Sequence, residues 1–327
     1  MLYLHFINVG DGDAVLVEER EGREVFRLLV DAGRPDVGVY PGSRRLTAAA
    51  YLARRGVSHL NALVVTHLHT DHFGGLSPLL EQTGVDTVYS GFFPRPPVGS
   101  IARTGTEEKT VRGLMDCLEQ WAALTNRLTD CREVEDTRSL ALTPRLRVEL
   151  IVPDPAAAAR QRRVWTALLS GEEPDRNMVW WSSKYRNPGS LRVRLYYAGR
   201  RVELAGDCYG AAWEDQAERC DLLKVPHHGD AKSVTPLLLD RLRPLHAVVS
   251  CSAAYNARKD RPSLPALALL EARGARVWFT DGFVRSGCAP DLWPSVNFLI
   301  QPDGTILSPD GLNHSSLLER ESAGRSI

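Results

Sequence analysis

Short apolar runs rich in β-branched residues recur along the chain, and most are too short to be helices. Runs of about four to eight such residues, bounded by polar or glycine-containing segments, are typical of strands. They predict strands at residues 2–7, 14–17, 25–30, 62–66, 148–152, 191–197, 202–204, 222–225 and 247–250. Because the early strands follow one another almost directly and the helical patterns come later, we expect mixed sheets covered by helices.

Helical periodicity with start and stop signals lies between some of these strands. Residues 43–55 end at Gly56, and residues 264–273 follow Ser263, a candidate N-cap, and end before Gly274. We interpret residues 1–327 as a single domain.

Two stretches interrupt this pattern and are predicted to be insertions, at residues 91–138 and 153–189. The first opens with several prolines and continues into an amphipathic segment at 111–124. The second holds four aromatic residues among charged ones: Trp165, Trp180, Trp181 and Tyr185. We expect these rings to pack a long loop or, alternatively, to form a lid over a site. Residues 282–327 are predicted to be a C-terminal extension.

Composition narrows the functional classes. The chain has 327 residues, of which 43% are hydrophobic, so it is long enough to bury a core. Its 40 Lys+Arg balance 40 Asp+Glu, which argues against a polycation that binds nucleic acid by charge alone. The sequence shows no long apolar run and no signal-peptide pattern, so we expect a cytoplasmic protein without membrane segments. Its 6 cysteines lie far apart and are expected to be reduced thiols.

The strongest chemical signal is His67-Leu68-His69-Thr70-Asp71-His72, directly after the predicted strand at residues 62–66. In an extended segment His67 and His69 point the same way, and a turn can bring Asp71 and His72 to a neighbouring position. Imidazole and carboxylate suit zinc, manganese or iron, and a hydroxide shared by two such ions is a nucleophile near neutral pH. The spacing therefore predicts a site for two metal ions.

A site of this kind needs further ligands at strand ends, and the chain supplies them. Asp207 follows the strand at residues 202–204, and His227 and His228 follow the strand at residues 222–225. Asp31 ends the strand at residues 25–30, where it can orient a ligand histidine. Taken singly, an aspartate beside a glycine is common turn chemistry. Their joint occurrence with the histidine cluster favours a metal site.

The order of these motifs resembles that of the metallo-β-lactamase fold hydrolases, and more specifically of their ComEC-type branch. Residues 6–14 (FINVGDGDA) are similar to the branch's strand followed by VGQGDA, and residues 224–229 (KVPHHG) match its KVxHHG. Residues 150–153 (LIVP) and 187–191 (NPGSL) resemble a strand ending in proline and an Asn-rich entry to a long strand. The resemblance covers residues 2–281.

This resemblance implies an α/β (α+β) fold, a four-layer αββα sandwich with two mixed β-sheets. It also implies two divalent metal ions, zinc or manganese, where strand-end loops meet. His67 and His69 would bind the first ion, Asp71 and His72 would bind the second, and Asp207 would bridge them.

One of His227 and His228 would complete the second position. Strand alternation means that only one of them need face the ions, and the sequence leaves open which. Asp13 would lie behind the ligands or beside the substrate. Among the ligands, we expect Asp71, Asp207 and His228 to take part most directly in catalysis.

The chain departs from the family pattern in three places. Many metallo-β-lactamase fold enzymes have another histidine between HxHxDH and the bridging aspartate, but residues 73–206 contain none. The branch's HHGS ends here in Asp230, and its later GHP reads Asp260-Arg261-Pro262. Arg261 can bind a phosphate oxygen but cannot donate its proton near neutral pH. Arg261 and Lys232 are expected phosphate contacts.

The resemblance implies hydrolysis of phosphodiesters by a metal-activated hydroxide, with nuclease activity as one form of it. DNA, RNA, a nucleotide or a phosphocholine-like ester would be the substrate. The membrane segments of a ComEC channel are absent, so we expect a stand-alone hydrolase. Two alternatives remain: a thioester or lactone hydrolase of the same fold, and an inactive metal-binding sensor or partner protein. The retained HxHxDH motif, Asp207 and HHG motif argue against the inactive form. The Arg- and Ala-rich composition hints at a bacterial source.

Overall fold

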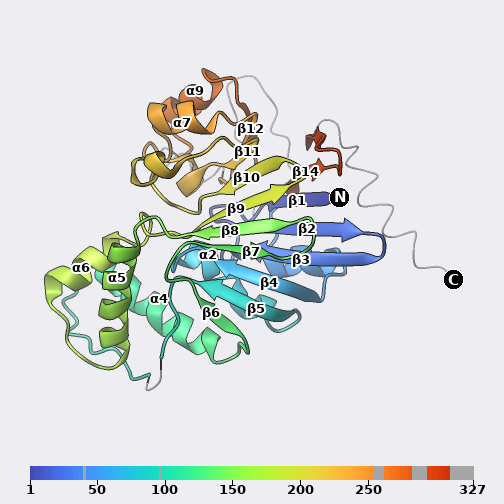
Figure 1. Cartoon of the computed structure of the whole chain (residues 1–327). Helices are drawn as coiled ribbons and strands as arrows, with labels where there is room; N and C mark the ends of the chain where they lie inside the picture. Colours follow the sequence, from blue (N-terminus) through green and yellow to red (C-terminus); the bar gives the residue numbers. More distant parts are fainter. Residues whose placement is uncertain (40–41, 96–97, 253–260, 282–292, 310–327) are drawn as a thin grey trace.

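The computed structural model describes residues 1–39, 42–95, 98–252, 261–281 and 293–309. Within them the chain forms two β-sheets that pack face to face, with helices on both outer faces (Figure 1). This mixed α/β arrangement is the αββα sandwich that the sequence predicts.

The first sheet has eight strands in the order β15-β14-β1-β2-β3-β4-β5-β6. It is antiparallel from β15 to β3 and parallel from β3 to β6, so it is a mixed sheet. Its strands are β1 (Leu2–Ile7), β2 (Val15–Glu21), β3 (Glu24–Val30), β4 (His59–Val65), β5 (Gly84–Ser90), β6 (Cys131–Glu133), β14 (Ser295–Ile300) and β15 (Ile306–Leu307).

The second sheet has seven strands in the order β13-β12-β11-β10-β9-β8-β7. It is parallel from β13 to β10 and antiparallel from β10 to β7. Its strands are β7 (Arg138–Ala141), β8 (Arg147–Ile151), β9 (Arg192–Tyr197), β10 (Arg200–Leu204), β11 (Leu222–Lys224), β12 (His246–Val249) and β13 (Arg276–Phe279).

Helices cover the outer face of each sheet. Figure 1 shows α7 and α9 on the flank of the second sheet, and α4, α5 and α6 on the opposite side of the molecule. The helices are α1 (Ala48–Arg54), α2 (Thr70–Phe73), α3 (Leu76–Leu79), α4 (Lys109–Thr125), α5 (Pro155–Leu169), α6 (Arg176–Lys184), α7 (Pro236–Leu242) and α9 (Leu264–Glu271).

Strand alternation explains how the two sheets build three apolar layers. In β4, Ala62 and Val64 point into the layer between the sheets, whereas Leu63 and Val65 point towards the helices of the first sheet. The third layer lies between the second sheet and the helices α7 and α9. Burial on both faces accounts for the nearly continuous apolar runs of the central strands.

All the strands predicted from the sequence are present, with bounds that differ by a few residues. The helix predicted from residue 43 begins later, at Ala48, because the Thr47 side chain caps it by accepting from Ala50 N. The stretch at residues 153–189 holds the helices α5 and α6. Trp165 is buried in the core beside the first sheet, whereas the Trp180 side chain is 48% exposed.

The predicted C-terminal extension is described only in part. Residues 282–292 and 310–327 lie outside the described residues. Between them, β14 pairs with β1 and β15 pairs with β14, so this part of the chain completes the first sheet.

Parallel strands of both sheets end at the same edge of the sandwich. The carboxyl ends of β3 and β4 lead to Asp31 and His67, and those of β10 and β11 lead to Asp207 and His227. Loops at the carboxyl ends of parallel strands commonly form binding sites. The fold thus gathers at one edge residues that are far apart in sequence.

Candidate metal centre

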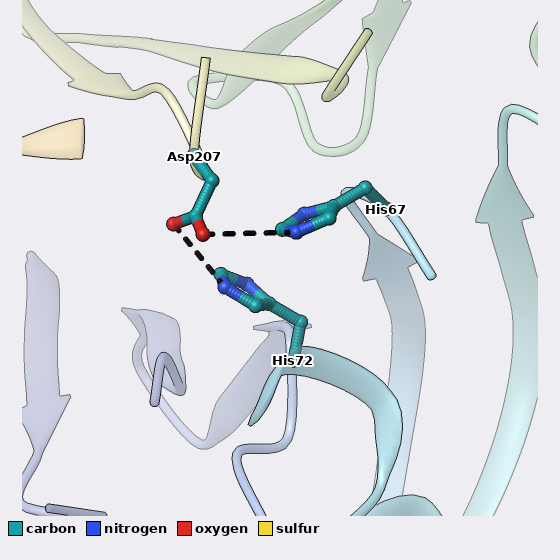
Figure 2. Close-up of side chains that lie close together, drawn as sticks. All are labelled: His67, His72 and Asp207. Carbon is teal, nitrogen blue, oxygen red and sulfur yellow. Dashed lines mark ion pairs between the residues drawn. The ribbon is translucent and has the colours of Figure 1, made fainter. Parts of the chain in front are cut away.

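Asp207 lies at the centre of the cluster, between histidines from both sheets. Its Oδ1 is 3.2 Å from His72 Nε2, and its Oδ2 is 3.7 Å from His67 Nε2. Figure 2 shows the two carboxylate oxygens turned towards different imidazoles. The His67 and His69 rings meet edge to face, with His67 Nε2 2.8 Å from His69 Nδ1.

Asp31 fixes the orientation of His72. The Thr66 backbone N–H and hydroxyl donate to the Asp31 carboxylate at 2.8 and 2.7 Å, and His72 Nδ1 donates to Asp31 Oδ2 at 2.7 Å. With Nδ1 engaged in this way, Nε2 of His72 is directed at Asp207. Such a carboxylate–histidine pair is the usual support of a metal-binding imidazole.

His227 and His228 do not continue β11, which ends at Lys224. They form a tight turn with φ values of 47° and 57°, followed by Gly229 at 75°. Two successive non-glycine residues in the left-handed region cost about 1–2 kcal/mol each, and such strain is often found at functional sites. Both imidazoles consequently approach Asp207, although strand alternation requires only one of them to face the site.

His228 contacts the second half of the HxHxDH motif. Its Nε2 is 3.5 Å from Asp71 Oδ2 and 4.0 Å from Asp207 Oδ1, and its Nδ1 donates to the Ser250 carbonyl at 3.1 Å. Asp13 lies behind this group, 3.7 Å from His228 Nδ1, and its carboxylate accepts from the buried Lys224 ammonium.

His227 lies on the other side of Asp207. Its Nε2 is 3.8 Å from Asp207 Oδ2 and 3.0 Å from Asn187 Nδ2. Its Nδ1 faces Asp230 Oδ2 at 3.9 Å. Arg261 Nε donates to the same Asp230 oxygen at 3.2 Å.

The electrostatics of the group favour positive charge. Burial opposes ionisation of Asp207, but His72 and His228 outweigh it and hold its pKa well below its usual range. Burial also lowers the pKa of His228, yet Asp207 and Asp71 raise it overall to about 9. Burial lowers the pKa of His69 to about 3 and that of His227 to about 4, so these two imidazoles are neutral near pH 7. Burial also lowers the pKa of His67, whereas Asp207 and Asp31 outweigh burial and raise the pKa of His72, so a cation bound here would replace protons on His72 and His228.

The residues present fit divalent metal ions. His72 Nε2, Asp207 Oδ1 and His228 Nε2 are buried and have no hydrogen-bond partner among the described residues. Buried polar atoms without partners are uncommon and call for a ligand or an ion. Three groups among the described residues have ligand atoms within 4.8 Å of one another: His67, His72 and Asp207; Asp71, His72 and His228; and Asp13, Asp31 and His72. Ligand atoms around tetrahedral zinc lie about 3.3 Å apart, close to the spacing of these donors.

The two predicted phosphate contacts lie at the margin. Arg261 is engaged by Asp230, and the Lys232 ammonium lies 5.4 Å from the centre of the Tyr209 ring. Asp260 lies outside the described residues.

The sequence interpretation gave no role to Lys224 or Asn187. Both lie in segments that resemble the ComEC-type pattern, Lys224 in KVPHHG and Asn187 in NPGSL, and this resemblance was the available signal. Their contacts with Asp13 and His227 depend on the fold.

Among the described residues, no helix combines the length and the apolar character needed to cross a membrane. The five cysteines that the structure describes, Cys117, Cys131, Cys208, Cys220 and Cys251, are free thiols.

Comparison with known proteins agrees with this architecture. A model of the metallo-beta-lactamase superfamily matches residues 7–111. The chain is 23% identical over 292 residues to the ComE operon protein 3 of Bacillus subtilis, an alignment that covers 84% of this chain and 31% of that protein. The chain thus spans about a third of the length of this curated relative.

Solved structures with a similar arrangement include the metallo-beta-lactamase fold protein YhfI of Bacillus subtilis. It is 14% identical, with a TM-score of 0.46 over 85% of this chain and 96% of that chain. A putative metal-dependent hydrolase of Parabacteroides distasonis is 12% identical, with a TM-score of 0.45 over 85% and 92% of the two chains.

Proposed function

We propose that this chain, which has the metallo-β-lactamase fold, is a metal-dependent hydrolase that cleaves phosphodiester bonds with two divalent ions, zinc or manganese. The substrate would be DNA, RNA or a nucleotide. Metal-dependent hydrolysis follows from the fold and the donor set, and the phosphodiester is the more specific part of the proposal.

The position of Asp207 supports this function most strongly. One buried carboxylate faces imidazoles through both of its oxygens, with His72 on one side and His67 on the other. A carboxylate in this position can bridge two ions. Ions held there would lower the pKa of a bound water and neutralise the charge that develops on a phosphodiester.

The chain's own residues would hold this arrangement rigid. Asp31 directs His72, and the Ser250 carbonyl directs His228, so neither imidazole needs to reorient. Asp71 is the least buried of the central carboxylates, with an 18% exposed side chain. Its Oδ2 lies 3.5 Å from His228 Nε2, so the two side chains would bind the same ion.

A cation at the mouth of the site supports an anionic substrate. The Arg34 side chain is 39% exposed, and its Nε donates to the Asp11 carbonyl at 3.0 Å. Its Nη2 lies 3.8 Å from Asp71 Oδ2. A guanidinium held in this position can bind a phosphate oxygen while the ester lies against Asp71 and Asp207.

Metal content and turnover together test the proposal. The wild type is loaded with zinc or manganese, dialysed, analysed by plasma mass spectrometry, and assayed on bis-p-nitrophenyl phosphate and a thioester. We expect about two ions per chain and phosphodiester turnover. Asp207→Asn should lose both, whereas Asp86→Asn, at a half-exposed carboxylate outside the cluster, should retain both.

Other outcomes would redirect the assignment. Turnover of the thioester alone would overturn the phosphodiester specificity and leave a hydrolase of another ester class. Two bound ions without turnover of any substrate would favour a metal-binding sensor.

A further inference from the structure

We propose that His227 and His228 bind different metal ions. His227 completes the first position, with His67 and His69, in place of the histidine that residues 73–206 do not contain. His228 completes the second position, with Asp71 and His72. This inference rests on the proposed function, because it assumes two bound ions.

The two oxygens of Asp207 divide the histidines into two groups. Oδ1 is nearest to His72 and His228, at 3.2 and 4.0 Å. Oδ2 is nearest to His67 and His227, at 3.7 and 3.8 Å. If Asp207 bridges two ions, one through each oxygen, His227 belongs to the ion of His67 and His228 belongs to the ion of His72.

In His72, His228 and His227 the orientation of the ring leaves Nε2 available to bind an ion. In His72 and His228, Nδ1 donates to an acceptor behind the site, and Nε2 faces the carboxylates. His227 has the same orientation, because its Nε2 faces Asp207 and its Nδ1 faces Asp230. At 3.9 Å the contact with Asp230 is too long for a direct hydrogen bond, but a carboxylate there favours the tautomer with a free Nε2.

Asp230 and Arg261 are held together, which links the three departures from the ComEC-type pattern. Arg261 Nε donates to Asp230 Oδ2 at 3.2 Å, and the Asp230 backbone N–H donates to the His227 carbonyl at 3.0 Å. His227 N donates in turn to the Gly206 carbonyl at 3.1 Å, next to Asp207. Asp230 and Arg261, which replace the family's serine and histidine, thus lie around His227. His227 in turn would take the place of the histidine that residues 73–206 do not contain.

Asn187 is the rival ligand for the first position. Its Nδ2 lies 3.0 Å from His227 Nε2, and its Oδ1 is buried without a hydrogen-bond partner among the described residues. The geometry favours His227, because its nitrogen faces the bridging carboxylate. Asn187 is then a neighbour that donates to the imidazole when no ion is bound.

Zinc stoichiometry in single and double variants tests the division. We expect about two Zn²⁺ per chain in the wild type, one in His227→Ala, one in His228→Ala, and none in the double variant. His59→Ala changes a half-exposed histidine at the start of β4, away from the cluster at the end of that strand, and should keep two. Circular dichroism and urea denaturation in chelator establish that each variant is folded.

A double variant that keeps one ion would overturn the inference, because both histidines would then serve one position. Two ions in His227→Ala, together with one in Asn187→Ala, would overturn it in favour of the rival ligand. Both results would leave the proposed function intact. A wild type that binds no zinc or manganese and turns over no phosphodiester would instead overturn the proposed function itself.

The positioning role of Asp230 has its own readout. Asp230→Asn should weaken binding of the ion that His227→Ala loses by about 10- to 100-fold, as expected for a group that orients a ligand. Binding of the other ion and stability in chelator should not change. Equal weakening of both ions would contradict a specific role at His227.

Discussion

Two buried carboxylates four residues apart, Glu203 in β10 and Asp207 just beyond its end, have contrasting surroundings. The Glu203 side chain is fully buried, and its oxygens accept from Arg192 Nη1 at 2.9 Å and from Arg194 Nε at 2.7 Å. Asp207 is 2% exposed. Among the described residues its carboxylate forms ion pairs only with imidazoles, and its Oδ1 has no hydrogen-bond partner there.

The difference gives a physical criterion that separates a structural charge from a candidate functional one. Arginine stays protonated at every relevant pH, so the chain itself neutralises Glu203. Histidines can release their protons, so the charge of Asp207 is available to a bound cation. Burial alone does not separate the two carboxylates, whereas the chemistry of their partners does.

The largest expected effect is on the free energy of unfolding when the charge of Glu203 or of Asp207 is removed. Glu203→Gln leaves the buried Arg192 guanidinium unpaired and should cost about 3–5 kcal/mol of unfolding free energy. Asp207→Asn in chelator should cost less than half of that, because the neighbouring imidazoles can become neutral. Urea denaturation at pH 7 measures both values.

For metal content we expect the opposite order, with the larger loss in Asp207→Asn. Glu203→Gln should bind two ions per folded chain, and Asp207→Asn should bind none. Equal destabilisation by the two substitutions, or loss of metal from both, would break the distinction between the two carboxylates.

The next effect is the stabilisation that bound ions give to the folded state. An ion present at 100 times its Kd adds about 2.7 kcal/mol of unfolding free energy if it does not bind the unfolded chain. We expect this gain on adding zinc to the wild type and to Glu203→Gln, and no gain in Asp207→Asn. Denaturation with and without chelator measures it. A gain of the same size in Asp207→Asn would mean that the ions bind elsewhere.

The sequence predicts much of the fold, and much of the candidate ligand set, from local patterns. The apolar runs identify strands because central strands are buried on both faces. The HxHxDH motif and Asp207 are recognisable because each directly follows such a run. β14 and β1, in contrast, pair along their full length although they are almost the whole chain apart in sequence, and no local pattern predicts that contact.

The orientation of His227 and His228 could not be predicted for a related reason. Both adopt left-handed backbone conformations, which are uncommon for residues other than glycine and are not predictable from the local sequence. The turn is held from outside, by His227 N bonding to Gly206 O and by Ser263 N bonding to Gly229 O. Tertiary contacts therefore decide which imidazoles face Asp207.

Glu18 is another buried carboxylate that, like Glu203, is neutralised by arginines of the chain, and it provides a further test of the comparison. Glu18, in β2, contacts Arg20, Arg27 and Arg55 at 3.0, 3.0 and 2.9 Å, and its side chain is 1% exposed. Burial opposes ionisation of Glu18, but His5 and the arginines outweigh it and hold its pKa well below its usual range. If clusters of this kind are structural, Glu18 should contribute to stability and should have no effect on metal binding.

The smallest expected effect is the pH dependence of that contribution. Because the folded pKa of Glu18 is depressed, its stabilisation is fully present above the ordinary value of 4.5 and is lost as pH falls below it. Wild type should lose about 1.4 kcal/mol per pH unit there relative to Glu18→Gln, so the stability gap between them narrows on acidification. Urea denaturation from pH 7 to pH 3.5, with exposed Glu81→Gln as a surface control, measures this gap. A gap that stayed constant with pH would show that the Glu18 charge does not stabilise the fold, and the partner chemistry of buried carboxylates would then not separate structural from functional ones.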